Sequence, residues 1–157
     1  VRSYYQGLIL KPKGYLIEKY NSDLELVSEY NYKLKGSDFV NGFLKNGQLN
    51  LLFLKYNPNR GEYEYWVHTS PIIDFNFKEK KLLSIASEEV NNPVGKNYYN
   101  RDFSRGFTTA ILFNEDKTGF VISTHHKRGK SNKHIIHLFD TALNKKFEYD
   151  FSDELCF

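Results

Sequence analysis

Short runs of hydrophobic residues, or of alternating hydrophobic and polar residues, recur along the whole chain. No stretch keeps apolar residues at the i, i+3, i+4, i+7 spacing over three turns, as the buried face of a helix requires. The runs are rich in β-branched and aromatic residues, which favour strands. They predict strands near residues 4–10, 14–20, 24–33, 38–45, 48–56, 63–76, 81–88, 106–113, 119–126, 134–140 and 145–151.

Turn sequences separate these runs. Asn46-Gly47 is typical of a two-residue β-hairpin, and Pro12 with Gly14 is typical of a tight turn. Longer hairpin loops are expected at 57–61 and 114–119. Because the connections are short, we predict an all-β, antiparallel fold in which consecutive strands pair.

One pattern recurs along the chain: an aromatic residue, an Asn or Asp turn, and a return strand. It occupies residues 20–32 and, with the same internal spacing, residues 139–151, with a weaker copy at 75–85. A further hairpin precedes the second and third copies. The chain therefore divides into sets at 4–33, 38–88 and 106–151, with a loop insertion at 88–106. Four antiparallel strands in about 40–50 residues is the size of a β-propeller blade.

The segment from Ile111 to Ser123, ILFNEDKTGFVIS, resembles the hairpin of TolB-like and WD40-like β-propeller repeats. The segment from Leu138 to Leu143 resembles the outer hairpin of the same blades. The Lys-, Asn-, Tyr- and Phe-rich style is similar to that of uncharacterised propeller-like proteins of flavobacteria-type bacteria. The turn differs from the family pattern, since Glu115-Asp116-Lys117 replaces Pro-Asp-Gly, and no Trp-Asp pair is present. The resemblance implies an architecture and brings no catalytic residues with it.

Propeller blades are buried on both faces, so both faces of their strands should be apolar. Centring the turn of the 119–140 hairpin on Lys130 pairs Val121 with Phe139 on one face and Ile122 with Leu138 on the other. The sets amount to about two and a half to three blades, whereas a closed ring needs about four. The chain begins at Val1 and has no Met, so we expect it to be part of a longer propeller. The alternative is a β-sandwich of two sheets.

The composition narrows the function classes. The chain has 157 residues, 40% of them hydrophobic and 17% aromatic, which excludes a disordered protein. The net charge of +3 is interspersed, so nucleic acid is not an expected partner. No apolar run approaches the ~18 residues of a transmembrane helix. The single Cys excludes an internal disulfide. The family resemblance favours the periplasm or the cell surface.

Two segments are candidate binding sites. The 88–106 insertion carries Tyr98, Tyr99, Arg101 and Asp102, a mixture of aromatic and charged residues found at contact hot spots, although a structural loop is the alternative. The basic hairpin tip carries Lys127, Arg128 and Lys130, which suit an anionic partner, although solvated tips are commonly basic.

Two further groups of residues could carry chemistry. His126 is predicted to face His134 across the hairpin, but two ligands are too few for a tight zinc site, so we predict no metal and no cofactor. Glu62 and Glu64 share a strand face with Trp66, which indicates the solvated face of an edge strand more than a glycosidase pair.

Since no nucleophile, phosphate-loop or metal motif is present, catalysis is not expected. The sequence predicts a non-catalytic β-propeller-like scaffold or protein-interaction module, whose partner is a protein or the rest of a longer propeller chain. A carbohydrate-binding or glycan-active propeller and a self-assembling β-sandwich are the alternatives.

Overall fold

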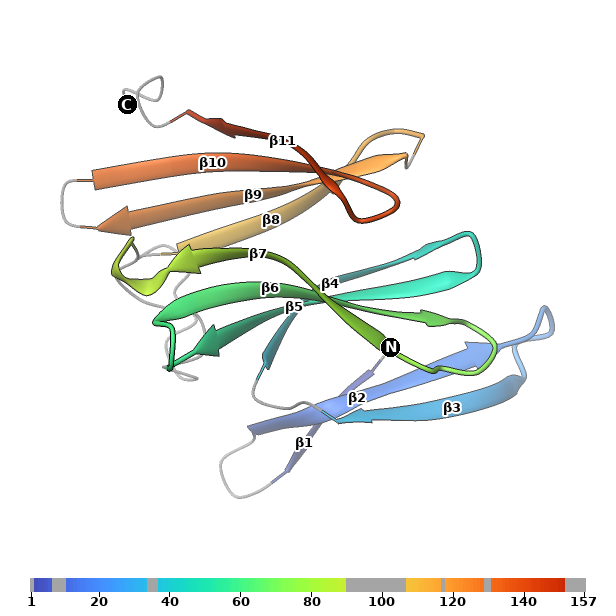
Figure 1. Cartoon of the computed structure of the whole chain (residues 1–157). Helices are drawn as coiled ribbons and strands as arrows, with labels where there is room; N and C mark the ends of the chain where they lie inside the picture. The colour runs from blue at the N-terminus through green and yellow to red at the C-terminus, as the bar shows by residue number, and fades with distance from the viewer. Residues whose placement is uncertain are drawn as a thin grey trace. The chain divides into compact units, whose positions relative to one another are not determined.

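The computed structural model describes residues 2–6, 11–33, 37–89, 107–116, 118–128 and 131–151. These residues form antiparallel β-sheets and one short 3-10 helix, which confirms the all-β prediction (Figure 1). The chain separates into two compact units, Val1–Ser37 and Asp38–Phe157.

The first unit is a three-stranded sheet, called here the first sheet. Its strands are β1 (Arg2–Gln6), β2 (Lys11–Tyr20) and β3 (Leu26–Lys33), paired in sequence order. Gly14 lies where β2 passes close to its neighbours, and a Cβ at this position would collide with the Tyr32 carbonyl oxygen and the Tyr4 side chain. Only glycine fits this close approach.

The second unit contains two four-stranded meanders, each with its strands in sequence order. The second sheet consists of β4 (Ser37–Lys45), β5 (Gln48–Asn57), β6 (Glu62–Pro71) and β7 (Lys78–Ala86), followed by η1 (Ser87–Glu89). The third sheet consists of β8 (Phe107–Phe113), β9 (Gly119–Arg128), β10 (Ser131–Asp140) and β11 (Lys145–Asp150).

The last hairpins of the first and third sheets close with the same hydrogen bonds. The side chain of Asn21 accepts a bond from the N–H four residues further on (2.8 Å), and Asp140 does the same (2.9 Å). Leu24 and Leu143 occupy the same place in the two turns, with positive φ angles of 62° and 63°. In the second sheet, Phe75 has a φ of 50° in the corresponding turn. A left-handed conformation costs an L-residue about 1 kcal/mol, so the side-chain bond of Asn21 or Asp140 offsets a local strain.

The second and third sheets pack face to face around one apolar core. One face of the second sheet contributes Leu52, Leu54, Tyr63, Tyr65, Val67, Leu83 and Ile85, and one face of the third contributes Phe120, Ile122 and Phe139. All ten side chains are 9% exposed or less. Burial of each contributes about 1.5–3 kcal/mol, so this interface is the main source of the unit's stability.

The two meanders stack in the same strand order. At the first strands, the Phe43 ring in β4 lies 4.9 Å from the Phe113 ring and 5.5 Å from the Phe120 ring, measured between centroids. At the last strands, Lys80 Nζ in β7 donates a 2.8 Å hydrogen bond to the Leu143 carbonyl oxygen in the β10–β11 turn. The first strand of the second sheet therefore lies beside the first two strands of the third sheet. The last strand of the second sheet lies beside the last hairpin of the third.

Two large apolar side chains on the opposite face of the second sheet are also buried. Leu51 and Phe53 of β5 point away from the third sheet and are 1% and 0% exposed. The Phe53 ring contacts the rings of Phe39 (5.8 Å between centroids) and His68 (4.7 Å). Strands with two buried faces carry nearly continuous hydrophobic runs, which explains the segment Leu51 to Leu54.

The register of the β9–β10 hairpin differs by one residue from the prediction. Phe139 lies opposite Phe120, and Leu138 lies opposite Val121. The reason is the length of the connection: Arg128 pairs with Ser131, so two residues join the strands where a turn centred on Lys130 had been expected. A slip of one residue exchanges the faces of a strand. Both faces are apolar, as predicted, but with different members.

Candidate functional site: an apolar row on the third sheet

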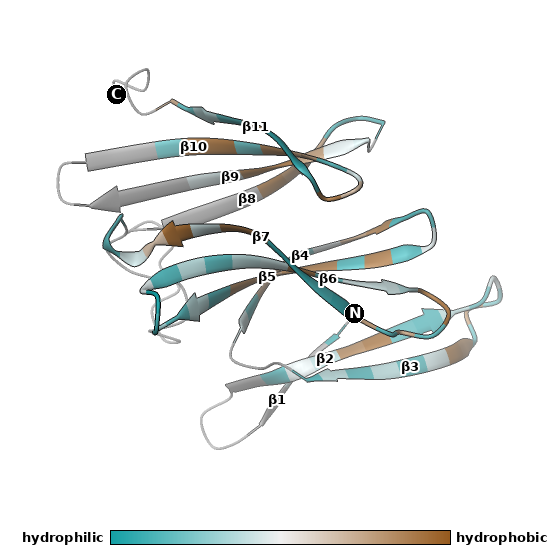
Figure 2. Ribbon diagram, viewed as in Figure 1, coloured by the Kyte–Doolittle hydropathy of each residue, from teal (hydrophilic) through white to brown (hydrophobic). Residues whose placement is uncertain are grey.

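The register of the third sheet aligns four apolar residues across all four of its strands. Leu112 pairs with Val121, Val121 with Leu138, and Leu138 with Phe147. Paired residues point to the same side of a sheet, so these four side chains form one continuous line, the outer row. The row lies on the face opposite the core residues Phe120 and Phe139, because alternate residues of a strand point to opposite faces. Hydrophobic residues recur along β10 in Figure 2.

The outer row is open in this structure. Leu112 is 59% exposed, Leu138 37% and Phe147 54%. Beside the row, Tyr149 is 39% exposed, and its ring lies nearly parallel to that of Phe147, with 6.1 Å between centroids. Single exposed hydrophobic residues are ordinary on protein surfaces, but a contiguous apolar line marks an interaction surface.

A serine–histidine pair lies on the same face. Ser123 Oγ is 2.9 Å from His134 Nε2, a geometry that a nucleophilic site would use. Acyl transfer also needs N–H donors that can bind an oxyanion. β9 and β10 are paired with strands on both sides, so their N–H groups are committed to the sheet. The pair therefore acts as a cross-strand hydrogen bond.

A second polar group lies on the core-facing side of the same sheet. His137 is 6% exposed, and its Nδ1 is 3.0 Å from Glu148 Oε2. Lys145 Nζ lies 2.9 Å from the same carboxylate oxygen. The Lys145 hydrogen bond is the largest influence on the pKa of Glu148 and, together with the charge of Lys145 and the contact with His137, lowers it against the opposing effect of burial. The arrangement anchors β11 to β10.

Glu64 is buried, which corrects the sequence prediction for this residue. β6 pairs with both β5 and β7, so it is a central strand and not an edge, and Glu64 is 4% exposed. Its carboxylate accepts hydrogen bonds from Trp66 Nε1 (2.9 Å) and Asn57 Nδ2 (3.1 Å), and Lys81 Nζ lies 3.5 Å away. These partners compensate for the lost hydration, so Glu64 has a structural role.

Burial is the largest single influence on the pKa of Glu64 and acts to raise it. The hydrogen bonds from Trp66 and Asn57 and the charge and hydrogen bond of Lys81 together outweigh burial, so the pKa lies below its ordinary value of 4.5. Glu64 is therefore ionised at neutral pH and is not a general acid.

Most of the residues predicted for binding fall outside the described part of the chain. Tyr98, Tyr99, Arg101, Asp102 and Lys130 lie there, and for Lys127 and Arg128 only the backbone, in β9, is described. The contacts predicted for these residues stay predictions.

The metal candidates are not brought together as predicted. His134 pairs with His125, while His126 pairs with Lys133, because of the one-residue difference in register. Within the described ranges, no group of three or more His, Cys, Asp and Glu side chains could hold a metal ion. No helix in the same ranges has the length and apolarity to cross a membrane.

No protein-family model matches this chain, and neither the curated proteins nor the solved structures gave a match. The function proposed below is therefore inferred from the fold and from the outer row.

Sequence reasoning missed the outer row because of the predicted register. With Phe139 placed opposite Val121, Leu138 falls opposite Ile122 and the line across the sheet is broken. The alternation of Phe147, Tyr149 and Phe151 in the last strand was the available signal, since it places three aromatic residues on one face.

Proposed function

We propose that this chain is a non-catalytic β-propeller-like scaffold and that a further blade of the same ring, an antiparallel β-sheet, packs on the outer row. The observation that carries the proposal is the line of Leu112, Val121, Leu138 and Phe147 across the third sheet, in which Leu112, Leu138 and Phe147 are exposed.

The packing inside the second unit supports a sheet as the occupant. The two meanders of the second unit pack face to face and stack in the same strand order. The second sheet buries one face against the third sheet. Because the two sheets stack in the same order, the free face of the third sheet is the equivalent of that buried face. Neighbouring strands lie about 4.8 Å apart, so a row across four strands is about 14 Å wide. A second sheet packed face to face, at an inter-sheet distance of about 10 Å, would cover the whole row.

The repeated turns support blades of one kind. The last hairpin of each sheet contains a hydrophobic residue with a positive φ angle, Leu24, Phe75 or Leu143. These turns and the four-stranded meanders are what the TolB-like and WD40-like resemblance implies. A β-sandwich that assembles with copies of itself would instead cover the outer row with a second copy of this chain.

Binding of a glycan is the second candidate function. It is favoured by the nearly parallel, exposed rings of Phe147 and Tyr149, since aromatic faces can stack on sugar rings. A glycan array distinguishes the two functions, because a row used for sheet packing should bind no glycan on the array.

Replacing Leu138 and Phe147 together by lysine should remove most of the exposed apolar surface of the outer row. We expect the wild-type chain to bind a hydrophobic dye, because the row is exposed in the isolated chain. Association of copies as the concentration rises would instead indicate the self-assembling β-sandwich. The double variant should sediment as an 18.5 kDa monomer at all concentrations and bind about 5-fold less dye.

A matched control replaces two exposed hydrophobic residues outside the third sheet, Leu24 (81% exposed) and Ile73 (83%), by lysine. This control should behave as the wild type. Circular dichroism checks that all three chains are folded. Equal dye binding by the wild type and the Leu138→Lys, Phe147→Lys variant would refute the proposed role of the row.

A further inference from the structure

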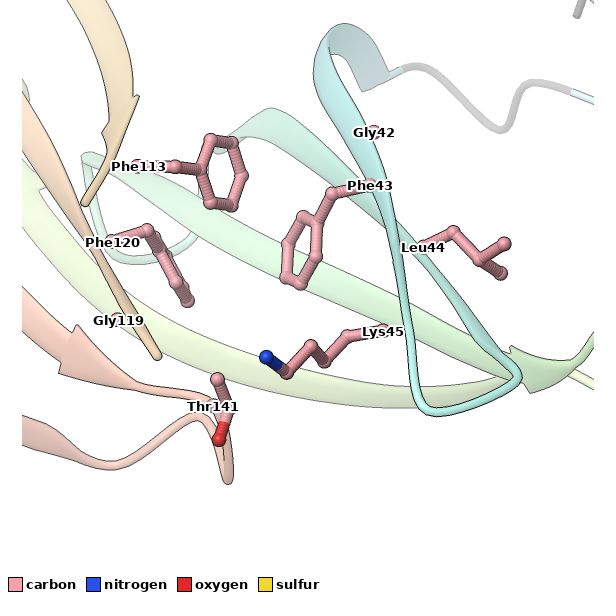
Figure 3. Close-up of a pocket in the computed structure, with 8 residues that line it drawn as sticks. All are labelled: Gly42, Phe43, Leu44, Lys45, Phe113, Gly119, Phe120 and Thr141. Atoms are coloured by element: carbon pink, nitrogen blue, oxygen red, sulfur yellow. The ribbon is translucent and has the colours of Figure 1, made fainter. Parts of the chain in front are cut away.

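A cleft opens at the end of the interface between the second and third sheets, separate from the outer row. It has a volume of about 340 Å³ and is lined by Gly42, Phe43, Leu44, Lys45, Phe113, Gly119, Phe120 and Thr141. These residues come from β4, the facing ends of β8 and β9, and the β10–β11 turn (Figure 3). Ligand sites usually have volumes of about 300–1,000 Å³, so the cleft can admit a ligand of one or two rings.

Three aromatic rings form the apolar wall of the cleft. The Phe43 and Phe113 rings meet edge to face at 4.9 Å, and the Phe120 ring lies 5.5 Å from Phe43 and 5.8 Å from Phe113, between centroids. Phe120 is fixed from behind by stacking on Phe139, with centroids 5.3 Å apart. Because its neighbours hold it in place, this wall is preformed, which reduces the cost of ordering a ligand site.

One cation and one hydroxyl group border the aromatic wall. In Figure 3 the Lys45 side chain extends across the cleft toward Thr141. Within the described residues, no carboxylate forms an ion pair with Lys45. Its charge does act on Asp116, whose pKa is lowered mainly by hydrogen bonds from Thr118, with Lys45 as a minor influence. Thr118 donates two hydrogen bonds to Asp116, which stays an anion, so a ligand carboxylate on Lys45 would share the ammonium's charge with Asp116.

Gly119 lines the cleft beside these groups. A Cβ at this position would approach the Phe139 carbonyl oxygen to 3.0 Å, closer than ordinary van der Waals contact. Gly119 N–H is already used, since it donates to the side chain of Asn114 (2.9 Å). The polar contacts left for a ligand are therefore those of Lys45 and Thr141.

We propose that this cleft binds a small aromatic carboxylate, with the ring against Phe43, Phe113 and Phe120 and the carboxylate on Lys45 Nζ and the Thr141 hydroxyl. The Lys45 ammonium is a point charge that attracts a carboxylate, the Thr141 hydroxyl can donate a hydrogen bond to it, and the aromatic wall favours a flat apolar body. This site does not depend on the occupant of the outer row, so the two proposals succeed or fail separately.

The test uses phenylacetate and its neutral analogue phenylacetamide as probes, with ¹H–¹⁵N NMR spectra of the 157-residue chain. Phenylacetate should shift the amide signals of Lys45, Gly119 and Thr141 and saturate at about millimolar concentration, as expected for so small a ligand. Phenylacetamide should bind about 10-fold more weakly, because it lacks the charge.

The variant Lys45→Gln should weaken phenylacetate binding about 10-fold and leave phenylacetamide binding unchanged. Its matched control is Lys55→Gln, at an exposed position of β5 outside the cleft, which should bind both probes as the wild type does. Absence of a saturable shift in the wild-type chain, equal binding of the two probes, or unchanged phenylacetate affinity in Lys45→Gln would each overturn the proposal.

Discussion

Replacing Phe120 by alanine should lower the free energy of unfolding of the second unit by about 3–5 kcal/mol. Phe120 is 1% exposed and belongs to the apolar core between the second and third sheets. The change removes its contacts with Phe43, Phe113 and Phe139 and leaves a cavity between two sheets. Such a loss is a large part of the stability of a domain of this size, so the sheets should separate at ordinary temperature or at low urea concentration.

Urea denaturation followed by circular dichroism measures this effect. The matched control is Leu112→Ala, in the adjacent strand but on the opposite face, where the side chain is 59% exposed. This control should change the free energy of unfolding by less than about 1 kcal/mol. If both variants lost the same stability, the two faces of the third sheet would be equally buried, contrary to the structure.

Replacing Glu64 by alanine should cost about 3 kcal/mol at pH 7. The change leaves Trp66 Nε1, Asn57 Nδ2 and Lys81 Nζ without their common acceptor in a buried region. Glu64→Gln keeps an acceptor and removes the charge, so its cost should be smaller. Glu88→Ala, at an exposed position of η1, is the control and should change the free energy of unfolding by less than about 0.5 kcal/mol.

The pH dependence of Glu64 has a definite sign. Its pKa in the folded chain lies below 4.5, so its ionised form contributes stability that is fully present above pH 4.5 and is lost as the pH falls through the folded-state pKa. The stability difference between wild type and Glu64→Gln should therefore shrink on going from neutral to acidic pH. A difference that stayed constant or grew on acidification would contradict the hydrogen-bonded, ionised carboxylate.

The sequence alone predicted most of the strands and their antiparallel order, because hydrophobic alternation and turn residues are local signals. Asn46-Gly47 illustrates this, since both residues have positive φ angles, as a two-residue hairpin requires. The shared positions of Leu24 and Leu143 were likewise visible as a repeated turn sequence. Two predictions were wrong: Pro12 and Gly14, predicted to form a tight turn, lie within β2, and the strand predicted over 63–76 ends at Pro71.

The features that the sequence did not reveal depend on register or on distant segments. The length of the β9–β10 connection shifted every pair in that hairpin by one residue and hid the outer row. Glu64 was predicted to lie on an edge strand, although the predicted pairing of consecutive strands placed its strand between two others. Nothing local indicates that Lys81 lies within reach of Glu64. Lys45, Phe113 and Thr141 meet in the cleft from three separate segments, a convergence that sequence periodicity does not encode.

We propose that another β-sheet covers the outer row in the native protein. Hydroxyl-radical footprinting with mass spectrometry tests it by comparing the protein isolated from its source with the purified 157-residue chain. We expect Leu138, Phe147 and Tyr149 to be labelled strongly in the purified chain and at least about 5-fold less in the isolated protein, as burial of these side chains requires. The exposed turn residue Ile73 should be labelled equally in both. Equal labelling of Leu138, Phe147 and Tyr149 in the two samples would contradict the scaffold that we propose.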